Sequence, residues 1–338
     1  MRFPERAELV FRTRLSGGIG QAPASDGHGN LIVVHAEPRL SMLDEKGRTL
    51  WSERLASEAS SPPVMTSGGT ILIVTRDAEA LFYSSAGKLR FKRSLPLTDP
   101  RRRSLTIPTS SGGAWLASGS DLLELDERGA IVRQLHASGT LSTIAEENAA
   151  LIAVSDSGRV QIARSTGDLA LVGSFGGNVP EGAAVSAGKV FAVIDGHKFC
   201  ALDLTTGRVL TLANEVGVTL TGPVAMLDAP SAALVADGGF ISVRGKGGAE
   251  SARVPLSALG QGFDPAVRGL RAALLVSDPR GAIAAVRSGS DALVLREGNA
   301  FRLDDTSCLD PFRPTPTRTG IVFACRSGQL FGVSDKVQ

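Results

Sequence analysis

The chain of 338 residues is poor in the features that mark several common protein classes. Aromatic residues make up only 5%, and there are three cysteines. No apolar stretch approaches the roughly 20 residues that a helix needs to span a bilayer. The 36 basic and 34 acidic residues give a formal charge of +2, which argues against generic nucleic-acid binding. These absences exclude a membrane-spanning helix and disfavour a nucleic-acid partner.

Cysteine and leader signals are equally sparse. Cys200, Cys308 and Cys325 show no CxxC spacing, so we expect three buried free thiols. A Cys308–Cys325 bridge is the alternative in an oxidising compartment. The start, MRFPERAELVFRTRL, lacks the apolar segment of a signal peptide. Either the protein is cytoplasmic or a leader has been removed.

The chain does contain a repeat of about 40 residues. The segments LVFRTRL (residues 9–15), TLWSERL (49–55) and LRFKRSL (89–95) share a central aromatic residue and a final leucine. Apolar tetrads recur with a similar period and begin at Leu31, Ile71, Ala114, Leu151, Val190, Ala233, Ala273 and Ile321. The tetrads therefore divide the chain into eight units.

Short segments before and after the tetrads indicate strands, and those after the tetrads alternate apolar and polar residues. LSMLD from Leu40 and FCALD from Phe199 alternate apolar and polar residues, as half-buried strands do. Turn glycines follow most of these segments, and glycine reaches positive φ without a steric penalty. In the seventh unit, ALLV (273–276) is assigned as the second strand and IAAVR (283–287) as the third. Each unit is therefore predicted to contain about four antiparallel strands in about 40 residues.

Four-stranded units repeated in this way are typical of a β-propeller, in which radial repetition protects the strand edges. The last unit ends before its outer strand, whereas residues 9–15 form an outer strand without a unit of their own. We therefore predict an all-β, eight-bladed β-propeller of four-stranded antiparallel blades. It forms one domain over residues 1–338, and the N-terminal strand closes the last blade. Seven blades is the alternative.

The motif L-x-x-L-D, followed by glycine and then Trp or Phe, resembles the pyrroloquinoline-quinone-like (PQQ-like) repeat. It is clearest in LSMLDEKGRTLW (40–51) and is echoed in FCALDLTTGRVL (199–210). Proteins of this class include quinoprotein dehydrogenases and the non-catalytic propeller lipoprotein of the outer-membrane barrel-assembly machinery. The resemblance implies an extracytoplasmic location, in the periplasm or cell envelope, with the cytoplasm as the alternative.

Signatures of catalysis are missing from the sequence. There is no adjacent cysteine pair, no GxSxG and no HExxH, and the four histidines lie in different units. We interpret Trp51 and Trp115 as strand packing. One set of aspartates recurs in successive turns, and we interpret it as turn formers rather than a metal ring: Asp77, Asp121, Asp156, Asp195, Asp237 and Asp278. We predict no catalytic residue, cofactor or metal site.

Two long connections between units are the predicted partner-binding segments, because loops on a rigid scaffold carry binding groups. The first spans residues 96–106 and contains three consecutive arginines. The second spans residues 298–314 and places phenylalanine beside arginine, a pairing that protein interfaces favour when it is exposed. The predicted contact residues are Arg101, Arg102, Arg103, Phe301, Arg302, Asp304, Asp305, Phe312 and Arg313.

These observations favour a non-catalytic scaffold that binds a protein or peptide partner. The alternative is a small-molecule binder or enzyme that uses the central channel, with a quinone-like or sugar ligand. Charged residues on the innermost strands, Glu146 and Glu147 among them, either line a polar pocket or only hydrate the channel. We expect a monomer with no nucleic-acid partner and no transmembrane segment. Its membrane association then depends on a lipoprotein leader that has been removed.

Overall fold

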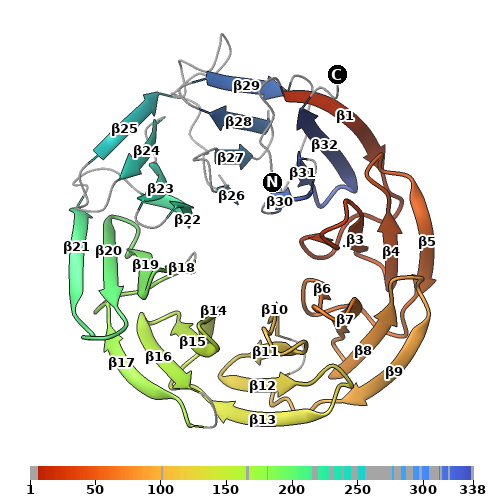
Figure 1. The fold of residues 1–338 in the computed structure, drawn as a ribbon, viewed down its shortest axis with the longest axis horizontal. Coiled ribbons are helices and arrows are strands. Elements are labelled where there is room, and N and C mark those ends of the chain that lie inside the picture. Colours follow the sequence, from red (N-terminus) through yellow and green to blue (C-terminus); the bar gives the residue numbers. More distant parts are fainter. Residues whose placement is uncertain are drawn as a thin grey trace.

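A computed structural model describes residues 7–99, 102–164, 167–180, 182–214 and 312–335, apart from 313 and 319. It also describes the backbones of the strands between residues 220 and 303. All regular elements in these residues are strands, and four-stranded sheets are arranged around a central axis (Figure 1). Within the same residues, no helix has the length and hydrophobicity to cross a membrane. The described part of the chain is therefore all-β.

Six of the sheets have described side chains, and we call each of them a blade. Within a blade the strands pair antiparallel, and the strand named first for each blade below lies nearest the axis (Figure 1). The first blade contains β2 (Ala24–Ser25), β3 (Leu31–Val34), β4 (Arg39–Leu43) and β5 (Thr49–Arg54), and the second contains β6 (Val64–Met65), β7 (Thr70–Val74), β8 (Glu79–Ser84) and β9 (Leu89–Ser94). The third contains β10 (Ser104–Pro108), β11 (Ala114–Ser118), β12 (Asp121–Leu125) and β13 (Ile131–His136), and the fourth contains β14 (Leu141–Glu147), β15 (Ala150–Ser155), β16 (Arg159–Arg164) and β17 (Ala170–Ser174). The fifth contains β18 (Ala183–Ser186), β19 (Lys189–Ile194), β20 (Lys198–Asp203) and β21 (Val209–Asn214).

The strands between residues 220 and 303 pair in the same antiparallel pattern. One group is β22 (Leu220–Asp228), β23 (Ser231–Ala236), β24 (Phe240–Arg244) and β25 (Glu250–Pro255), and the other is β26 (Val276–Ser277), β27 (Ile283–Val286), β28 (Ala292–Arg296) and β29 (Asn299–Leu303). The second group corrects the assignment of the seventh unit. IAAV is its second strand rather than its third, because Ala292–Arg296 and Asn299–Leu303 pair outside it.

The sixth blade joins the two ends of the chain, and we call it the closing blade. Its strands are β30 (Thr315–Pro316), β31 (Gly320–Ala324), β32 (Gln329–Asp335) and, outermost, β1 (Ala7–Arg14). β1 pairs antiparallel with β32 from Ala7↔Asp335 to Arg14↔Gln329. The strand formed by the first copy of the LVFRTRL segment therefore covers an edge that β32 would otherwise expose.

Aromatic side chains of the outer strands explain the repeated motif. In three successive blade pairs, a ring on the outer strand lies against the glycine of the next turn between third and fourth strands. A Cβ atom at Gly47 would lie 2.5 Å from the Phe11 ring, and one at Gly87 or Gly129 would lie 2.7 Å from Trp51 or Phe91, respectively. The Trp51 indole also donates a hydrogen bond to the Ser85 carbonyl (2.8 Å). Glycine is thus required here both for positive φ and for ring contact.

The aspartate of the L-x-x-L-D motif shapes the same turns. Asp44 accepts hydrogen bonds from the backbone N–H groups of Lys46 and Arg48 (2.9 and 2.8 Å). Asp126 does the same for Arg128 and Ala130 in the third blade. A short acidic side chain therefore satisfies the backbone donors of a tight turn and presents the glycine to the neighbouring blade.

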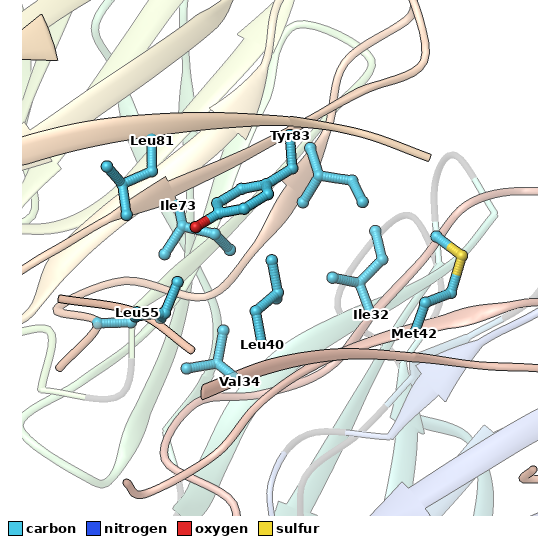
Figure 2. Packing of buried hydrophobic residues seen from close by; sticks show 10 residues of the cluster. Ile32, Val34, Leu40, Met42, Leu55, Ile73, Leu81 and Tyr83 are labelled. Carbon is cyan, nitrogen blue, oxygen red and sulfur yellow. The ribbon is translucent and has the colours of Figure 1, made fainter. Parts of the chain in front are cut away.

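The hydrophobic core lies between blades. Ile32, Val34 and Leu40 of the first blade pack against Ile73 and Leu81 of the second, and all five are buried (Figure 2). Similar clusters fill the spaces between the second, third, fourth and fifth blades. The first four blades therefore each bury both faces against described neighbours, which explains why their tetrads are apolar without alternation.

Ring packing changes after the third blade. Arg133 occupies the aromatic position of β13, donates to the Gly167 carbonyl and lies over the Trp115 ring at 5.4 Å. At the next junction the Val172 carbonyl, rather than a ring, approaches Gly207. A cavity of about 410 Å³, lined by Leu171 and Thr205 among others, lies there. Loss of the repeat's tryptophans thus leaves one junction less completely filled.

Candidate functional site

The connection that carries the three arginines is held at both ends. It joins β9 to β10, and we call residues 95–103 the arginine loop. Buried Leu95 donates its N–H to the Ala78 carbonyl (2.7 Å), and the Ser118 hydroxyl donates to the Asp99 carbonyl (2.9 Å). At its end, the Ser104 N–H donates to the Ser60 carbonyl (2.9 Å). The described residues on either side of this connection are therefore held against the second and third blades.

The arginine loop directs positive charge to the surface. Arg102 and Arg103 are exposed, and neither forms an ion pair within the described part of the chain. Arg101 lies outside the described residues. Because the strands alternate in direction, the loop emerges on the same face as the turns between second and third strands, and we call this the linker face. Two guanidinium groups on a fixed backbone are suited to a carboxylate partner.

Asp121, on the linker face, forms a hydrogen bond with the backbone of the arginine loop. Its Oδ2 accepts a hydrogen bond from the Thr98 N–H (2.9 Å), and its Oδ1 lies 3.2 Å from His136 Nδ1. Burial by itself raises the pKa of Asp121, but the hydrogen bonds from Thr98 and His136 outweigh it and hold the pKa below its ordinary value. The ionised carboxylate therefore stabilises the native loop.

The recurring aspartates thus differ from the prediction. The side chains of Asp121 and Asp195 accept N–H groups from the preceding inter-blade connections, those of Thr98 and Asn178 respectively. The sequence separations are 23 and 17 residues, which only tertiary structure brings together. Asp237 and Asp278 lie outside the described residues.

Replacement of Asp121 by Asn is expected to make the protein less stable at neutral pH by about 1–2 kcal/mol. The lowered pKa means that the wild-type contribution is present above the usual carboxyl range and is lost as the pH falls through the lowered pKa. Urea unfolding at pH 7 and pH 3 measures this, with a smaller difference expected at pH 3. Exposed Asp77→Asn is the charge-matched control. Equal effects of the two variants at pH 7 would contradict the role assigned to Asp121.

The second predicted segment is not a single exposed loop. Phe301 and Arg302 lie in β29, paired with Val294 and Leu293. Phe312 is buried, 8% exposed, in the cluster between the first and closing blades, and Arg326 covers its ring at 4.9 Å. The prediction of Phe312 as an exposed anchor was therefore wrong, because an isolated phenylalanine also fills core. The remaining predicted residues, Asp304, Asp305 and Arg313, lie outside the described residues.

The cysteines also differ from the expectation of three free thiols. Cys200 is buried and free, but Cys325 is disulfide-bonded. Cys308, the alternative partner considered from the sequence, lies outside the described residues. Burial raises the pKa of the Cys200 thiol, which makes it a structural residue rather than a reactive one.

The opposite face has a hollow, and Glu146, one of the two glutamates predicted either to line a polar pocket or to hydrate the channel, lies in its wall. Turns between first and second strands emerge there, and we call it the turn face. A cavity of about 660 Å³ opens among the turns of the first four blades. Its lining includes Ser25, Asp26, His28, Met65, Thr66, Pro108, Ser110 and Glu146. The signal in the sequence is faint: only the small residues of the innermost strands and the charge at Glu146 indicate it.

Comparison with known proteins gives one family match. Residues 5–127 match the family described as outer membrane protein assembly factor BamB. A search of curated proteins finds no match.

Solved structures extend the likeness to the fold of nearly the whole chain. BamB from Moraxella catarrhalis is 15% identical, with a TM-score of 0.70 and coverage of 97% of this chain and 99% of that one. The computationally designed Ika8 protein is 13% identical, with a TM-score of 0.75 and the same coverage of both chains. Streptogramin B lyase is 10% identical, with a TM-score of 0.60 and coverage of 80% and 92%.

The lyase shows that this fold also occurs in an enzyme, so the fold does not decide the activity. At these identities the solved structures establish the fold alone. The family match adds similarity in sequence over the first blades. The predicted resemblance is confirmed: this chain resembles the PQQ-like repeat propellers of the BamB family, in sequence over residues 5–127 and in fold over nearly its whole length.

Proposed function

We propose that the protein is a non-catalytic scaffold that binds a protein partner through the arginine loop on its linker face. One observation carries the proposal: the loop backbone is held by Asp121, Ser118 and Ser60, while the side chains of Arg102 and Arg103 remain exposed. The match of residues 5–127 to an assembly factor supports a binding role.

Preorganisation favours this loop as a binding element. A flexible loop loses conformational freedom when it binds, and that loss opposes affinity. Here hydrogen bonds already hold the backbone at Thr98, Asp99 and Ser104, so binding has less conformational freedom to remove at these positions. The partner surface that fits them is acidic, since guanidinium groups form paired hydrogen bonds with carboxylates.

The scaffold is proposed to be one closed, eight-bladed domain over residues 1–338. The antiparallel pairing of β22–β25 and β26–β29, and the likeness in fold across 97% of the chain, support this arrangement. A closed ring holds the arginine loop rigid relative to the other connections on the linker face. We propose that it acts as a monomer.

We propose an extracytoplasmic location, in the periplasm or cell envelope. The disulfide at Cys325 supports it, because disulfides persist in oxidising compartments and are rare in the cytosol. The family match to an outer membrane assembly factor points the same way.

Partner binding is tested by replacing the arginines. A photo-crosslinking residue at Pro96, exposed on the arginine loop, should form an adduct with a specific protein in cells. The double variant Arg102→Ala/Arg103→Ala should reduce that adduct about tenfold, since each exposed charge pair contributes up to about 1 kcal/mol. Mass spectrometry identifies the adduct and quantifies it.

The matched control is Lys88→Ala/Arg128→Ala, which removes two exposed positive charges from third-to-fourth-strand turns on the turn face. It should leave the adduct unchanged. An equal adduct in the arginine-loop variant and the wild type would rule out the proposed contact.

A further inference from the structure

One position on the outer strand distinguishes the fourth blade from the blades before it. This position pairs with the fourth residue of the third strand. In the closing, first and second blades it holds an aromatic residue, which is Phe11, Trp51 or Phe91. The third blade has Arg133 there, and the fourth has Ala170, which pairs with Ile162. The fourth blade therefore lacks the long side chain that reaches the next turn from each of the other four.

The open cavity of about 410 Å³ lies at this position, and we call it the junction cavity. Its described lining includes Ile162 and Ala170 of the fourth blade and Leu204 and Gly207 of the fifth. The Val172 carbonyl lies against Gly207, so backbone closes only part of the junction. Because a cavity of about 150 Å³ is enough for a benzene ring, the junction cavity has room for a phenyl or indole group.

The described lining of the junction cavity is mainly aliphatic. Its aliphatic side chains are Ile162, Ala170, Leu171, Val172 and Leu204. Arg164 and Asp168 add one charge of each sign, so a charged ligand gains no net attraction from the pair. The Arg164 guanidinium favours an aromatic ligand over an aliphatic one, because a cation is attracted to the face of a ring. The cavity therefore offers a ring both apolar contact and a cationic partner.

The outer edge of β17 supplies backbone groups beside the junction cavity. β17 is the last strand of its sheet, so one row of its N–H and C=O groups has no strand beside it within the described part of the chain. Charged side chains commonly protect such edges. Every outer strand described above contains a charged residue except β17 (ALVGS) and its neighbour β21 (VLTLAN). Leu171 and Leu210 of these two strands are 62% and 58% exposed, so this edge is both unprotected and apolar.

We propose that the junction cavity and the edge of β17 together bind an extended peptide segment that carries an aromatic residue. The backbone of the segment pairs with β17, and its ring enters the cavity beside Ala170. Side chains of directly opposed residues on paired strands lie about 5 Å apart, so a residue opposite Ala170 reaches the cavity. The partner's ring thereby replaces the one that Phe11, Trp51 and Phe91 provide at the earlier junctions. This inference does not depend on the arginine loop, which joins the second and third blades.

Calorimetric titration of the whole protein with two peptides tests the role of the ring. The probe is acetyl-Lys-Thr-Val-Trp-Val-Thr-Lys-amide, and its control has alanine in place of tryptophan. The tryptophan peptide should bind at least about tenfold more tightly, as expected for a buried aromatic anchor. Equal affinities of the two peptides, or no binding of the tryptophan peptide, overturns the proposal.

A third peptide tests the role of the backbone. It has the sequence of the probe, with N-methyl groups on the tryptophan and both valines. Because successive N–H groups of an extended chain point to opposite sides, these methyl groups remove donors from both edges of the peptide. The methylated peptide should bind at least about tenfold more weakly than the probe. Equal affinity overturns the proposed pairing with β17.

Filling the junction cavity from the protein's own side assigns the binding to it. Ala170→Trp should weaken binding of the tryptophan peptide at least about tenfold, because the new ring occupies the cavity. Ala170→Phe adds a smaller ring and is the second filling variant. Val132→Trp is the matched control, since it adds the same side chain at an exposed position of β13 that does not line the cavity. It should leave the affinity unchanged.

Melting curves verify that each variant is folded. Unchanged peptide affinity in a folded filling variant overturns the assignment to the junction cavity. Arg102→Ala/Arg103→Ala should leave peptide affinity unchanged, which separates this site from the arginine loop. The comparison of peptides on the wild-type protein decides the proposal independently of any variant.

Discussion

Deletion of residues 1–15 should lower the free energy of unfolding by about 3–5 kcal/mol, because it removes a whole outer strand together with the partly buried Phe11 and Leu15 side chains. The deletion removes β1, exposes the edge of β32 and takes Phe11 away from Gly332 and Gly47, against which its ring packs. An exposed strand edge also invites association between molecules. Urea unfolding and light scattering measure the two effects.

Deletion of residues 1–6 is the matched control, because it leaves β1 intact. A synthetic peptide of residues 7–15, added to the longer deletion, should restore part of the lost stability by pairing with β32. If the two deletion variants unfold at the same urea concentration and with the same slope, β1 does not close the ring in solution.

Gly87→Ala should destabilise the protein by about 2–4 kcal/mol, as the sum of a left-handed backbone penalty and overpacking. The φ angle of Gly87 is +81°, and the added Cβ would lie 2.7 Å from the Trp51 ring. The Trp51 indole is also held by its hydrogen bond to Ser85, so it cannot move without losing that bond. Chemical denaturation gives the difference in free energy.

Gly188→Ala separates the two contributions. Its φ angle is +70°, but nothing lies within 4 Å of the added Cβ, so only the backbone penalty of about 1–2 kcal/mol applies. In a Trp51→Ala background, the cost of Gly87→Ala should fall to that of Gly188→Ala. Equal costs for the two glycine variants in the wild-type background would show that the ring contact is not needed.

Sequence reasoning succeeded where one unit repeats another. The apolar tetrads became the second strands of the described blades, and the segment at residues 9–15 supplied β1. These patterns can be recognised in the sequence because the hydrogen bonding and burial that produce them act within one unit or between adjacent units of similar sequence. The seventh unit was misassigned because ALLV and IAAV are both short apolar segments, and only pairing distinguishes them.

Sequence reasoning was less informative for the site. Three consecutive arginines identified a candidate loop, but nothing local indicated that Asp121 would hold it through Thr98. Phe312 illustrates the opposite error, since its core cluster includes residues of the first blade, nearly the whole chain away in sequence. Whether a single aromatic residue is exposed depends on which distant residues pack over it. The sequence pattern around that residue does not contain this information.

The local motifs of this chain determine its blades: the aspartate and glycine set each turn, and the outer-strand aromatic residue specifies its contact with the next blade. Tertiary structure decides the rest. The closing blade brings together residues from the two ends of the chain, and the turn-face hollow needs side chains from four blades. Such features arise from geometry around the axis, where units distant in sequence become neighbours, so no single repeat can encode them.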